Sequence, residues 1–235
     1  QWSSFPDEHT NWIEEQRAWR ESCILMDQSF HLVNYYVEGP DALAVNSHLG
    51  VNHFDDMEPP SARQHPVANP DGYMIGDPVL FCLGEESVVV TGNRGLAQKW
   101  IQYNVETGDW DAEVVDLYSP YKEGPPVDFR FEVQGPNARD VMTEAFDGPL
   151  PDVGFFGMDT ASIDGVDVHV LGHGMAAAPG YEVFGPWEHH DRVRDHVLDI
   201  GEEHGIRQLG SKSYKSAILT SGWLPVGIPA VYESE

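Results

Sequence analysis

The sequence predicts an α+β protein built from two related halves. Strand-like and helix-like segments are both present, but they do not alternate regularly as they would in a series of βαβ units. A short pattern also occurs twice, because residues 37–42 (VEGPDA) return as residues 133–138 (VQGPNA). Each copy ends a strand-like run and opens a helix-like one, which favours an internal duplication of an α+β unit. We place the two halves at approximately residues 1–125 and 126–235.

Local signals place the elements of the first half. Thr10 is expected to cap the first helix, since its side chain can accept a hydrogen bond from the first helical turn. Gly39, Pro40 and Asp41 open a second helix, which Gly50 ends. In chain order we expect a helix over 11–20, an apolar run over 23–26, a strand over 33–37, a helix to 49, a long loop over 52–72, a hairpin of 79–83 with 87–91, a helix over 95–103 and a linker over 118–128.

The second half begins with the second copy of the repeated pattern. Asp164-Gly165 predicts a hairpin turn between strands 162–164 and 166–171. Glycine and proline bound a further strand, Tyr181–Phe184, on both sides. A helix with one apolar face is expected over 187–204, ended by Gly205.

The chain is strongly acidic. Its 235 residues contain 39 Asp and Glu against 13 Lys and Arg, and the acids are spread along the whole chain, which gives a formal charge of −26. A dispersed acidic surface with few lysines favours a protein adapted to high salt over an ordinary acidic protein, because salt screens the self-repulsion. The charge argues against binding to nucleic acid or to anionic membranes.

The two cysteines and the apolar runs suggest a cytoplasmic location. Cys23 and Cys82 lie in apolar surroundings, where buried thiols are expected rather than a disulfide. No apolar run reaches the length of a membrane span. The chain begins at Gln1 without a methionine, which suggests a trimmed or processed chain.

No known metal or nucleotide motif is present. None of the 11 histidines belongs to a His-x-x-x-His motif with the glutamate that zinc hydrolases use, and we expect no metal site. The sequence also lacks a phosphate-binding P-loop and a Gly-x-Ser-x-Gly nucleophile motif.

A few polar and aromatic residues remain as site candidates. Glu182 lies within an apolar strand, either facing water at an edge or accepting two adjacent N–H donors such as those of a pterin or guanine. Tyr214 has lysine neighbours that could lower its pKa, or it is a surface tyrosine. Trp223 is a core residue or a platform for a flat ligand. The other candidates are Asp27, Gln28, His31 and Arg94.

A series of motifs in a fixed order carries a family resemblance over essentially the whole chain. With x for any residue, they are NW at 11–12, EQ at 15–16, WR at 19–20, DQS at 27–29, GxDAL at 39–43, GxxIGD at 72–77, VQGP at 133–136, HGMA at 173–176, APGxE at 178–182, GP at 185–186, GSxxY at 210–214, SGW at 221–223 and LPxxxPAxY at 224–232. Together they resemble the glycine-cleavage T-protein (aminomethyltransferase) superfamily. The similarity is greatest to the tetrahydrofolate-dependent O-demethylases of vanillate and 3-O-methylgallate.

This resemblance implies a folate-binding aminomethyltransferase-type fold of two related α+β halves. It implies methyl transfer from a small methylated substrate to N5 of tetrahydrofolate, with Tyr214 as the general acid that protonates the leaving oxygen. It places Glu182 on the pterin, Trp223 at the folate site, and His31 and Gln28 near the methyl donor. Trp2 would replace an aromatic residue of the relatives' N-terminal extension.

The chain departs from the demethylases on the substrate side and at its C-terminal end. Asn93 stands where the relatives carry an arginine that meets the substrate carboxylate, and Arg94 follows one residue later. The C-terminal β-barrel domain of the relatives is expected to be absent, so a second subunit could supply that region. The alternatives are an aminomethyltransferase of glycine cleavage, which needs a lipoyl carrier protein, and a folate-binding protein or subunit without turnover.

Overall fold

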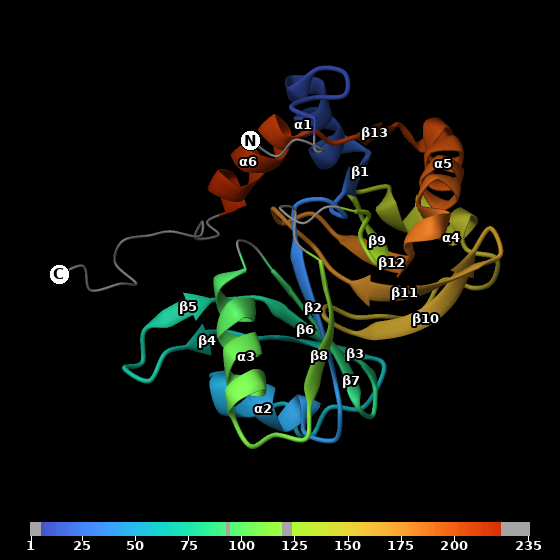
Figure 1. Cartoon of the computed structure of the whole chain (residues 1–235). Coiled ribbons are helices and arrows are strands. Elements are labelled where there is room, and N and C mark those ends of the chain that lie inside the picture. The colour runs from blue at the N-terminus through green and yellow to red at the C-terminus, as the bar shows by residue number, and fades with distance from the viewer. Residues whose placement is uncertain (1–5, 93–94, 119–123, 222–235) are drawn as a thin grey trace. The chain divides into compact units, whose positions relative to one another are not determined.

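A computed structural model describes residues 6–92, 95–118 and 124–221 (Figure 1). These residues form two compact units that we describe separately. The first combines the segment that ends at His31 with the segment that begins after residue 123, and the second begins at Leu32 and ends with the strand that stops at Tyr118. The units therefore differ from the predicted halves 1–125 and 126–235, because the N-terminal helix and strand join the unit of the second half.

The first unit contains a six-stranded sheet. Its strand order is β10-β11-β12-β9-β1-β13, and all neighbours are antiparallel except β1 and β13. The bounds are β1 Cys23–Asp27, β9 Asp128–Gln134, β10 Met158–Ile163, β11 Val166–Gly172, β12 Gly180–Pro186 and β13 Ile206–Gln208. The hairpin predicted at Asp164-Gly165 is confirmed as β10 and β11.

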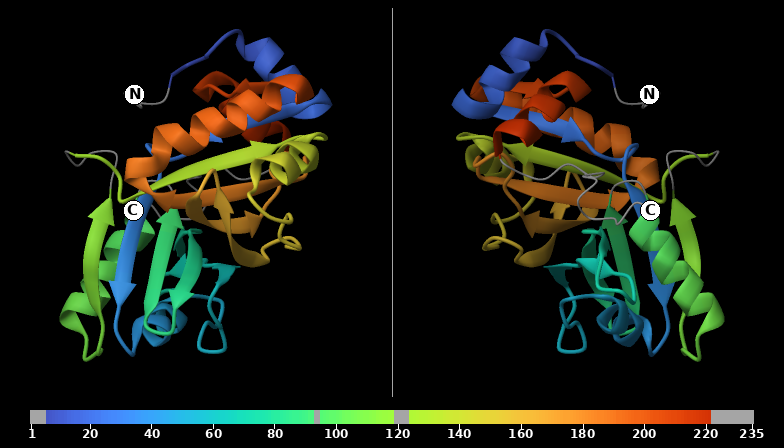
Figure 2. Two further views of the ribbon diagram at one scale, coloured as in Figure 1. Left: turned by 90° about the vertical axis from the view of Figure 1, so that its right-hand side faces the viewer. Right: turned by 90° about the vertical axis from the view of Figure 1, so that its left-hand side faces the viewer.

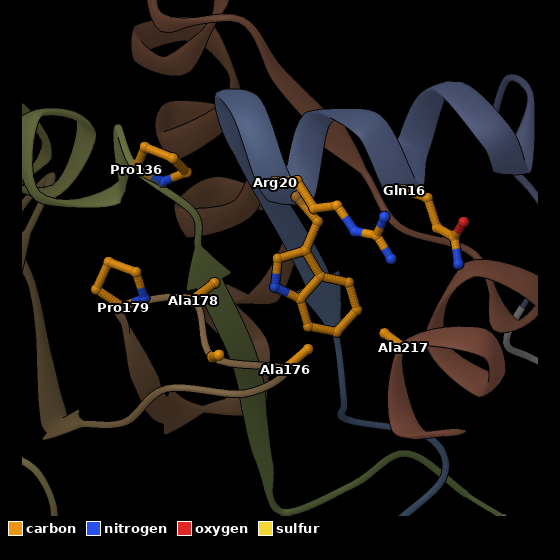
Figure 3. A pocket seen from close by; sticks show the side chains of 9 residues that line it. Gln16, Arg20, Pro136, Ala176, Ala178, Pro179 and Ala217 are labelled. Carbon is orange, nitrogen blue, oxygen red and sulfur yellow. The ribbon is translucent and has the colours of Figure 1, made fainter. Parts of the chain in front are cut away.

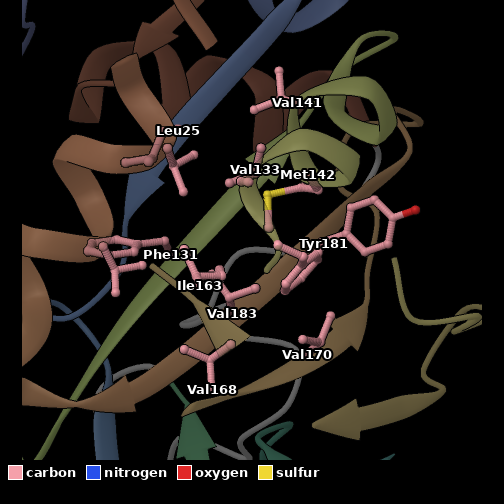
Figure 4. Close-up of a cluster of buried hydrophobic side chains, with 14 of the residues drawn as sticks. Leu25, Phe131, Val133, Val141, Met142, Ile163, Val168, Val170, Tyr181 and Val183 are labelled. Carbon is pink, nitrogen blue, oxygen red and sulfur yellow. The ribbon is translucent and has the colours of Figure 1, made fainter. Parts of the chain in front are cut away.

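Alternation along the central strands gives the two faces of this sheet different chemistry. In β9, Phe129, Phe131 and Val133 are fully buried in the core on one face (Figure 4). Helices α4 (Ala138–Ala145) and α5 (His190–Gly201) contribute to the same core. The residues between them in β9 are Arg130, Glu132 and Gln134, and by the two-residue period of a strand they lie on the opposite face.

Two helices and an apolar cluster occupy part of that opposite face. Ile24 and Met26 of β1 pack with Trp19 of α1 (Trp12–Glu21) and with Tyr214 and Ala217 of α6 (Ser211–Ser221). The polar residues of β9 are therefore next to a second, smaller core. This position explains how Glu132 and Gln134 come to be fully buried.

The second unit contains a five-stranded antiparallel sheet in the order β3-β6-β7-β2-β8. Helices α2 and α3 share a core with β2, β6 and β7, and Figure 2 shows these helices beside the sheet in two side views. The bounds are β2 Val33–Glu38, α2 Ala42–Leu49, β3 Ser61–Gln64, β6 Val79–Gly84, β7 Ser87–Gly92, α3 Leu96–Thr107 and β8 Glu113–Tyr118, with a small separate sheet of β4 Val67–Ala68 and β5 Met74–Gly76.

The two copies of the repeated pattern adopt the same local structure. Gly39 and Gly135 have φ angles of 126° and 124°, and each precedes a helix of eight residues. An added Cβ would lie 2.4 Å from the Asp111 carbonyl oxygen at Gly39 and 2.5 Å from the Ser22 carbonyl oxygen at Gly135. Each copy thus turns from a strand into a helix while packed against the residue that precedes a neighbouring strand, β8 for Gly39 and β1 for Gly135. This shared geometry supports the predicted duplication.

Several local predictions need correction. Asn11, not Thr10, caps α1, because its side chain accepts hydrogen bonds from the N–H groups of Ile13 and Glu14. The predicted loop over 52–72 contains β3 and β4, and β8 was not predicted. Short strands in polar segments are hard to recognise, because neighbouring strands rather than their own side chains stabilise them. No helix in the described ranges is long and apolar enough to cross a bilayer.

Candidate functional site

Four charged side chains meet on the polar face of the first unit's sheet. Glu132 of β9 and Glu182 of β12 are directly opposite each other in the antiparallel register. Arg130 donates to Glu182 and forms a buried ion pair with it. His173, just after β11, has its Nδ1 2.7 Å from Glu132 Oε1 and 3.5 Å from Glu182 Oε2. The alternative that Glu182 faces water at a sheet edge is wrong, since Glu182 is only 6% exposed and β12 is paired on both sides.

The pKa values of the two glutamates in this network shift in opposite directions. Burial opposes ionisation of Glu132, but His173 and hydrogen bonds from neighbours such as Gln134 outweigh it and lower the pKa of Glu132. Burial and the adjacent Glu132 raise the pKa of Glu182 to about 7, although Arg130 acts in the other direction. Burial also opposes the charge on His173, yet the two carboxylates raise its pKa to about 9.

The same residues resemble a metal-binding group in composition. Glu132, His173 and Glu182 each offer a donor atom, and these atoms lie within 4.8 Å of one another. Arg130 already supplies positive charge to Glu182, and Gln134 Nε2 donates to Glu132. Because the buried Arg130 guanidinium lies against Glu182 and would repel a cation, we treat the group as an ion-pair network rather than a metal site.

Tyr214 lies on α6 and is buried, with its ring 5.6 Å from the ring of His31, centroid to centroid. The expectation that nearby lysines lower its pKa is wrong. Burial, together with the charges of Glu132 and Glu182, raises the pKa of Tyr214 well above its ordinary value. Burial lowers the pKa of His31 to about 4 despite Asp27 and Glu132, so this imidazole is neutral at neutral pH.

Hydrogen bonds to the backbone of Arg130 hold the segment that follows β1. The N–H of Gln28 donates to the Arg130 carbonyl oxygen at 2.8 Å, and the N–H of Arg130 donates to Ser29 Oγ at 2.9 Å. Asp27 Oδ2 lies 2.8 Å from Nε2 of His190, the first residue of α5. Gln28 and His31 are therefore held beside the network, and both are buried.

The structure describes four of the eight predicted site residues. Glu182, Tyr214, His31 and Gln28 all lie on the polar side of the first unit. Trp2, Asn93, Arg94 and Trp223 lie outside the described residues.

Sequence reasoning missed Arg130, Glu132 and His173. The alternation of Asp-Phe-Arg-Phe-Glu-Val-Gln from 128 to 134 carried the signal for the first two, since a strand with aromatic residues on one face places charges on the other. His173 comes from the turn after β11, and only the pairing of β11 with β12 brings it to Glu132. No sequence pattern gives that contact.

Comparison with known protein families identifies the fold. A model of the family described as the GCVT N-terminal domain matches residues 2–227 of the chain. The chain belongs to this family. The mixed α and β fold described above is therefore that of this family, and the predicted resemblance to the glycine-cleavage T-protein superfamily is confirmed.

Individual relatives differ in how similar their sequences are to this chain. The chain is 38% identical over 226 residues to a syringate O-demethylase of Sphingobium sp., covering 95% of this chain and 49% of that protein. It is 24% identical to an aminomethyltransferase of Halothermothrix orenii, covering 95% of this chain and 60% of the relative. The chain thus spans about half the length of these relatives.

Two solved structures have a similar fold. The glycine cleavage aminomethyltransferase T of Bartonella henselae superposes with a TM-score of 0.74 at 19% identity, covering 92% of this chain and 56% of that one. A chain of the heterotetrameric sarcosine oxidase of Corynebacterium sp. U-96 gives a TM-score of 0.58 at 12% identity, covering 89% of this chain and all of that one.

Proposed function

We propose that this chain binds tetrahydrofolate and transfers a methyl group to its N5 from a small methylated substrate, with an aryl methyl ether as the favoured donor. The buried Glu182, held between Arg130, Glu132 and His173, is the observation that supports this proposal most directly. Family membership and the 38% identity to a syringate O-demethylase support the reaction class.

The environment of Glu182 suits a pterin ligand. A pterin edge offers adjacent N–H donors, which match a carboxylate with two acceptor oxygens. Glu182 keeps unused acceptor capacity beside Arg130, because each carboxylate oxygen can accept more than one hydrogen bond. Trp223 and Trp2 are proposed to complete the folate site.

Tyr214 is proposed as the general acid. The cofactor, when bound, supplies the N5 nitrogen that attacks the methyl carbon. As the new N–CH3 bond forms and the O–CH3 bond breaks, the departing oxygen takes the bonding electrons, and the Tyr214 hydroxyl gives it a proton. Because its pKa is raised, Tyr214 is protonated at neutral pH, as a proton donor must be. N5 would exchange its proton for the methyl group, and that proton would pass through solvent to restore the Tyr214 hydroxyl, so the products would be the free phenol and N5-methyl tetrahydrofolate.

The donor side of the site is proposed from the residues near Tyr214. His31 and Gln28 would position the methylated group, and the neutral His31 ring is 5.6 Å from that of Tyr214. Arg94 and Asn93 are proposed to bind the remainder of the substrate, with Arg94 as the partner of an acidic group.

Calorimetric titration with tetrahydrofolate in molar salt, with and without vanillate, tests this function. We expect saturable binding of tetrahydrofolate and a higher melting temperature, since a ligand at about 100 times its Kd stabilises the folded state by about 2.7 kcal/mol. A folded sample that shows neither effect would contradict the proposal. Binding that tightens with the aryl ether would support demethylation.

A Tyr214→Phe variant separates an enzyme from a binding protein. General acid catalysis contributes about 10²- to 10⁴-fold to rate, so methyl transfer should fall by that order while folate binding is kept. Tyr181→Phe is the matched control, because Tyr181 belongs to β12 next to Glu182 but faces the opposite core. Equal turnover in wild type and Tyr214→Phe would exclude Tyr214 as the acid.

Two alternatives follow from particular observations. The similarity to aminomethyltransferases supports aminomethyl transfer with a lipoyl carrier protein as partner. The match to an entire chain of a heterotetrameric sarcosine oxidase supports a folate-binding subunit whose partner subunit supplies further parts of the site. Co-purification with a second chain would favour the subunit.

We also propose a cytoplasmic protein adapted to high salt. Cys23 and Cys82 are both buried thiols, as expected in a reducing compartment. The formal charge of −26 suits a concentrated salt solution.

A further inference from the structure

A separate pocket opens beside α1 in the first unit. It has a volume of about 330 Å³ and is lined by Gln16, Trp19, Arg20, Pro136, the segment 176–179 and Ala217. Figure 3 shows Gln16 and Arg20 reaching from α1 over the hollow, with Ala176, Ala178 and Pro179 on its other side. The volume is at the lower end of the range for ligand sites, so it suits one small molecule rather than a cofactor or a peptide.

Arg20 gives this pocket a positive charge. Arg20 forms no ion pair or hydrogen bond with any residue in the described ranges, although acids outnumber bases 39 to 13 in the chain. Arg17 on the same helix pairs with Glu14 at 2.8 Å, and Arg63, Arg192 and Arg194 each pair with an aspartate. Arg20 is exposed and, like Arg139 and Arg207, has no carboxylate partner among the described residues, but Arg20 is the one of these three that lines this pocket. Its guanidinium can therefore bind a carboxylate from outside.

The rest of the lining combines apolar side chains with Gln16, whose amide donates a hydrogen bond to Ser216 Oγ. Trp19 is only 3% exposed, and its indole Nε1 has no acceptor among the described residues. Alanines and prolines form the other walls. Alanine, proline and tryptophan side chains thus form an apolar part of the hollow beside polar groups, a combination found in small-molecule sites, and the indole favours a flat ligand body.

The wall opposite α1 has a fixed shape. Ala176 and Ala177 have φ angles of 52° and 62°, which residues other than glycine rarely adopt. The turn is closed by a 2.9 Å hydrogen bond from the Ala178 N–H to the Met175 carbonyl oxygen. Met175 N in turn donates to Gln134 Oε1 at 2.9 Å, and Gln134 donates to Glu132. The pocket wall is thus attached to the ion-pair network that contains Glu182.

From these observations we infer that the pocket binds a small aryl carboxylate, with the carboxylate on Arg20 and the ring in the apolar hollow beside Trp19. None of the residues that line this pocket belongs to the proposed folate site, and the inference does not depend on the proposed function. Through the Met175–Gln134–Glu132 hydrogen bonds, its occupant can influence the network that holds Glu182.

Titration of the chain with benzoate at constant ionic strength tests the inference. We expect saturable one-to-one binding that Arg20→Gln weakens by about tenfold or more, because a charge-assisted hydrogen bond is lost. Arg17→Gln is the matched control on the same helix and should leave binding unchanged. Benzamide, which has the same ring without the charge, should bind at least about tenfold more weakly.

Two further measurements separate this pocket from other sites. Ala217→Leu adds bulk at the wall on α6 and should abolish benzoate binding without affecting a tetrahydrofolate titration of the same sample. Gln28→Ala, near the proposed methyl donor, should leave benzoate affinity unchanged. Absence of saturable benzoate binding, equal loss in both arginine variants, or loss in Gln28→Ala with none in Arg20→Gln would each overturn the inference. Circular dichroism melts confirm that each variant is folded.

Discussion

Glu182 is the residue whose protonation state most directly affects ligand binding. Burial and Glu132 raise its pKa to about 7, so part of the free protein holds a proton on Glu182 at neutral pH. A ligand with two N–H donors needs the ionised carboxylate. Binding of tetrahydrofolate should therefore release a proton.

This linkage predicts that tetrahydrofolate affinity rises with pH between about 6 and 7 and levels off above that. The slope below the pKa should approach about tenfold per pH unit, the limit for one proton released. Calorimetry in buffers of different ionisation enthalpy measures both the affinity and the number of protons. Glu182→Gln should bind more weakly and lose this pH dependence. An affinity that falls as pH rises would contradict the assignment of Glu182 to the pterin.

Tyr214 illustrates how position alters an expectation made from neighbours in the chain. Lys212 and Lys215 are exposed, whereas Tyr214 between them is buried toward Glu132 and Glu182. The helical period of α6 separates these side chains onto different faces. The sequence identified the residue, but only the packing of α6 decided the direction of its pKa shift.

At the level of elements, the strand-to-helix turns of the repeat depend on two glycines. We expect Gly39→Ala and Gly135→Ala each to lower the free energy of unfolding by more than about 1 kcal/mol, because the positive φ strains an L-residue and the new Cβ meets a carbonyl oxygen. Urea unfolding measures the change.

Two other glycines serve as controls for this prediction. Gly72 has a φ of 85° but nothing within 4 Å of an added Cβ, so Gly72→Ala tests strain alone. Gly148 has neither feature, and Gly148→Ala should change stability by no more than about 0.5 kcal/mol. Equal effects at Gly148 and Gly135 would show that the turns do not require glycine.

His190 connects α5 to the end of β1. Its Nε2 lies 2.8 Å from Asp27 and its Nδ1 2.9 Å from Asp191, while Arg194 is also nearby. Burial alone would lower the pKa of His190, but the hydrogen bond and charge of Asp27 and the contact with Asp191 raise it. The protonated ring therefore stabilises the folded state.

Because the folded-state pKa of His190 is above its unfolded value, this stabilisation is complete below the unfolded pKa and is lost as pH rises through the folded pKa. Wild type should be more stable than His190→Gln at pH 5.5, and the difference should shrink toward pH 8.5 in urea unfolding. His189→Gln, the preceding histidine, controls for removal of a histidine as such. A difference that grows with pH would contradict this role.

At the scale of the whole molecule, the large negative charge is the feature that most affects stability. With a formal charge of −26, repulsion between acids destabilises the compact state at low ionic strength. The Debye length falls from about 30 Å at 0.01 M to about 3 Å at 1 M salt, so screening removes most of this repulsion.

We therefore predict that the melting temperature rises steeply between about 0.01 M and 1 M sodium chloride. Potassium chloride at equal ionic strength should give the same rise if screening is the cause. Sucrose, which does not change the ionic strength, should not give the same rise. A melting temperature that stays constant or falls with added chloride would contradict adaptation to high salt.

The sequence by itself determined the α+β class, the internal repeat, most helices and the hairpins, because these follow from local periodicity and from turn residues such as Gly39 and Gly135. It also selected Glu182, Tyr214, Gln28 and His31. Only the tertiary structure placed the N-terminal strand β1 in the sheet of the second half, since strand pairing joins segments far apart in the chain. The same long-range pairing brought Arg130, Glu132 and His173 to Glu182. The charge state of that network depends on burial and on contacts across strands, which no local pattern specifies.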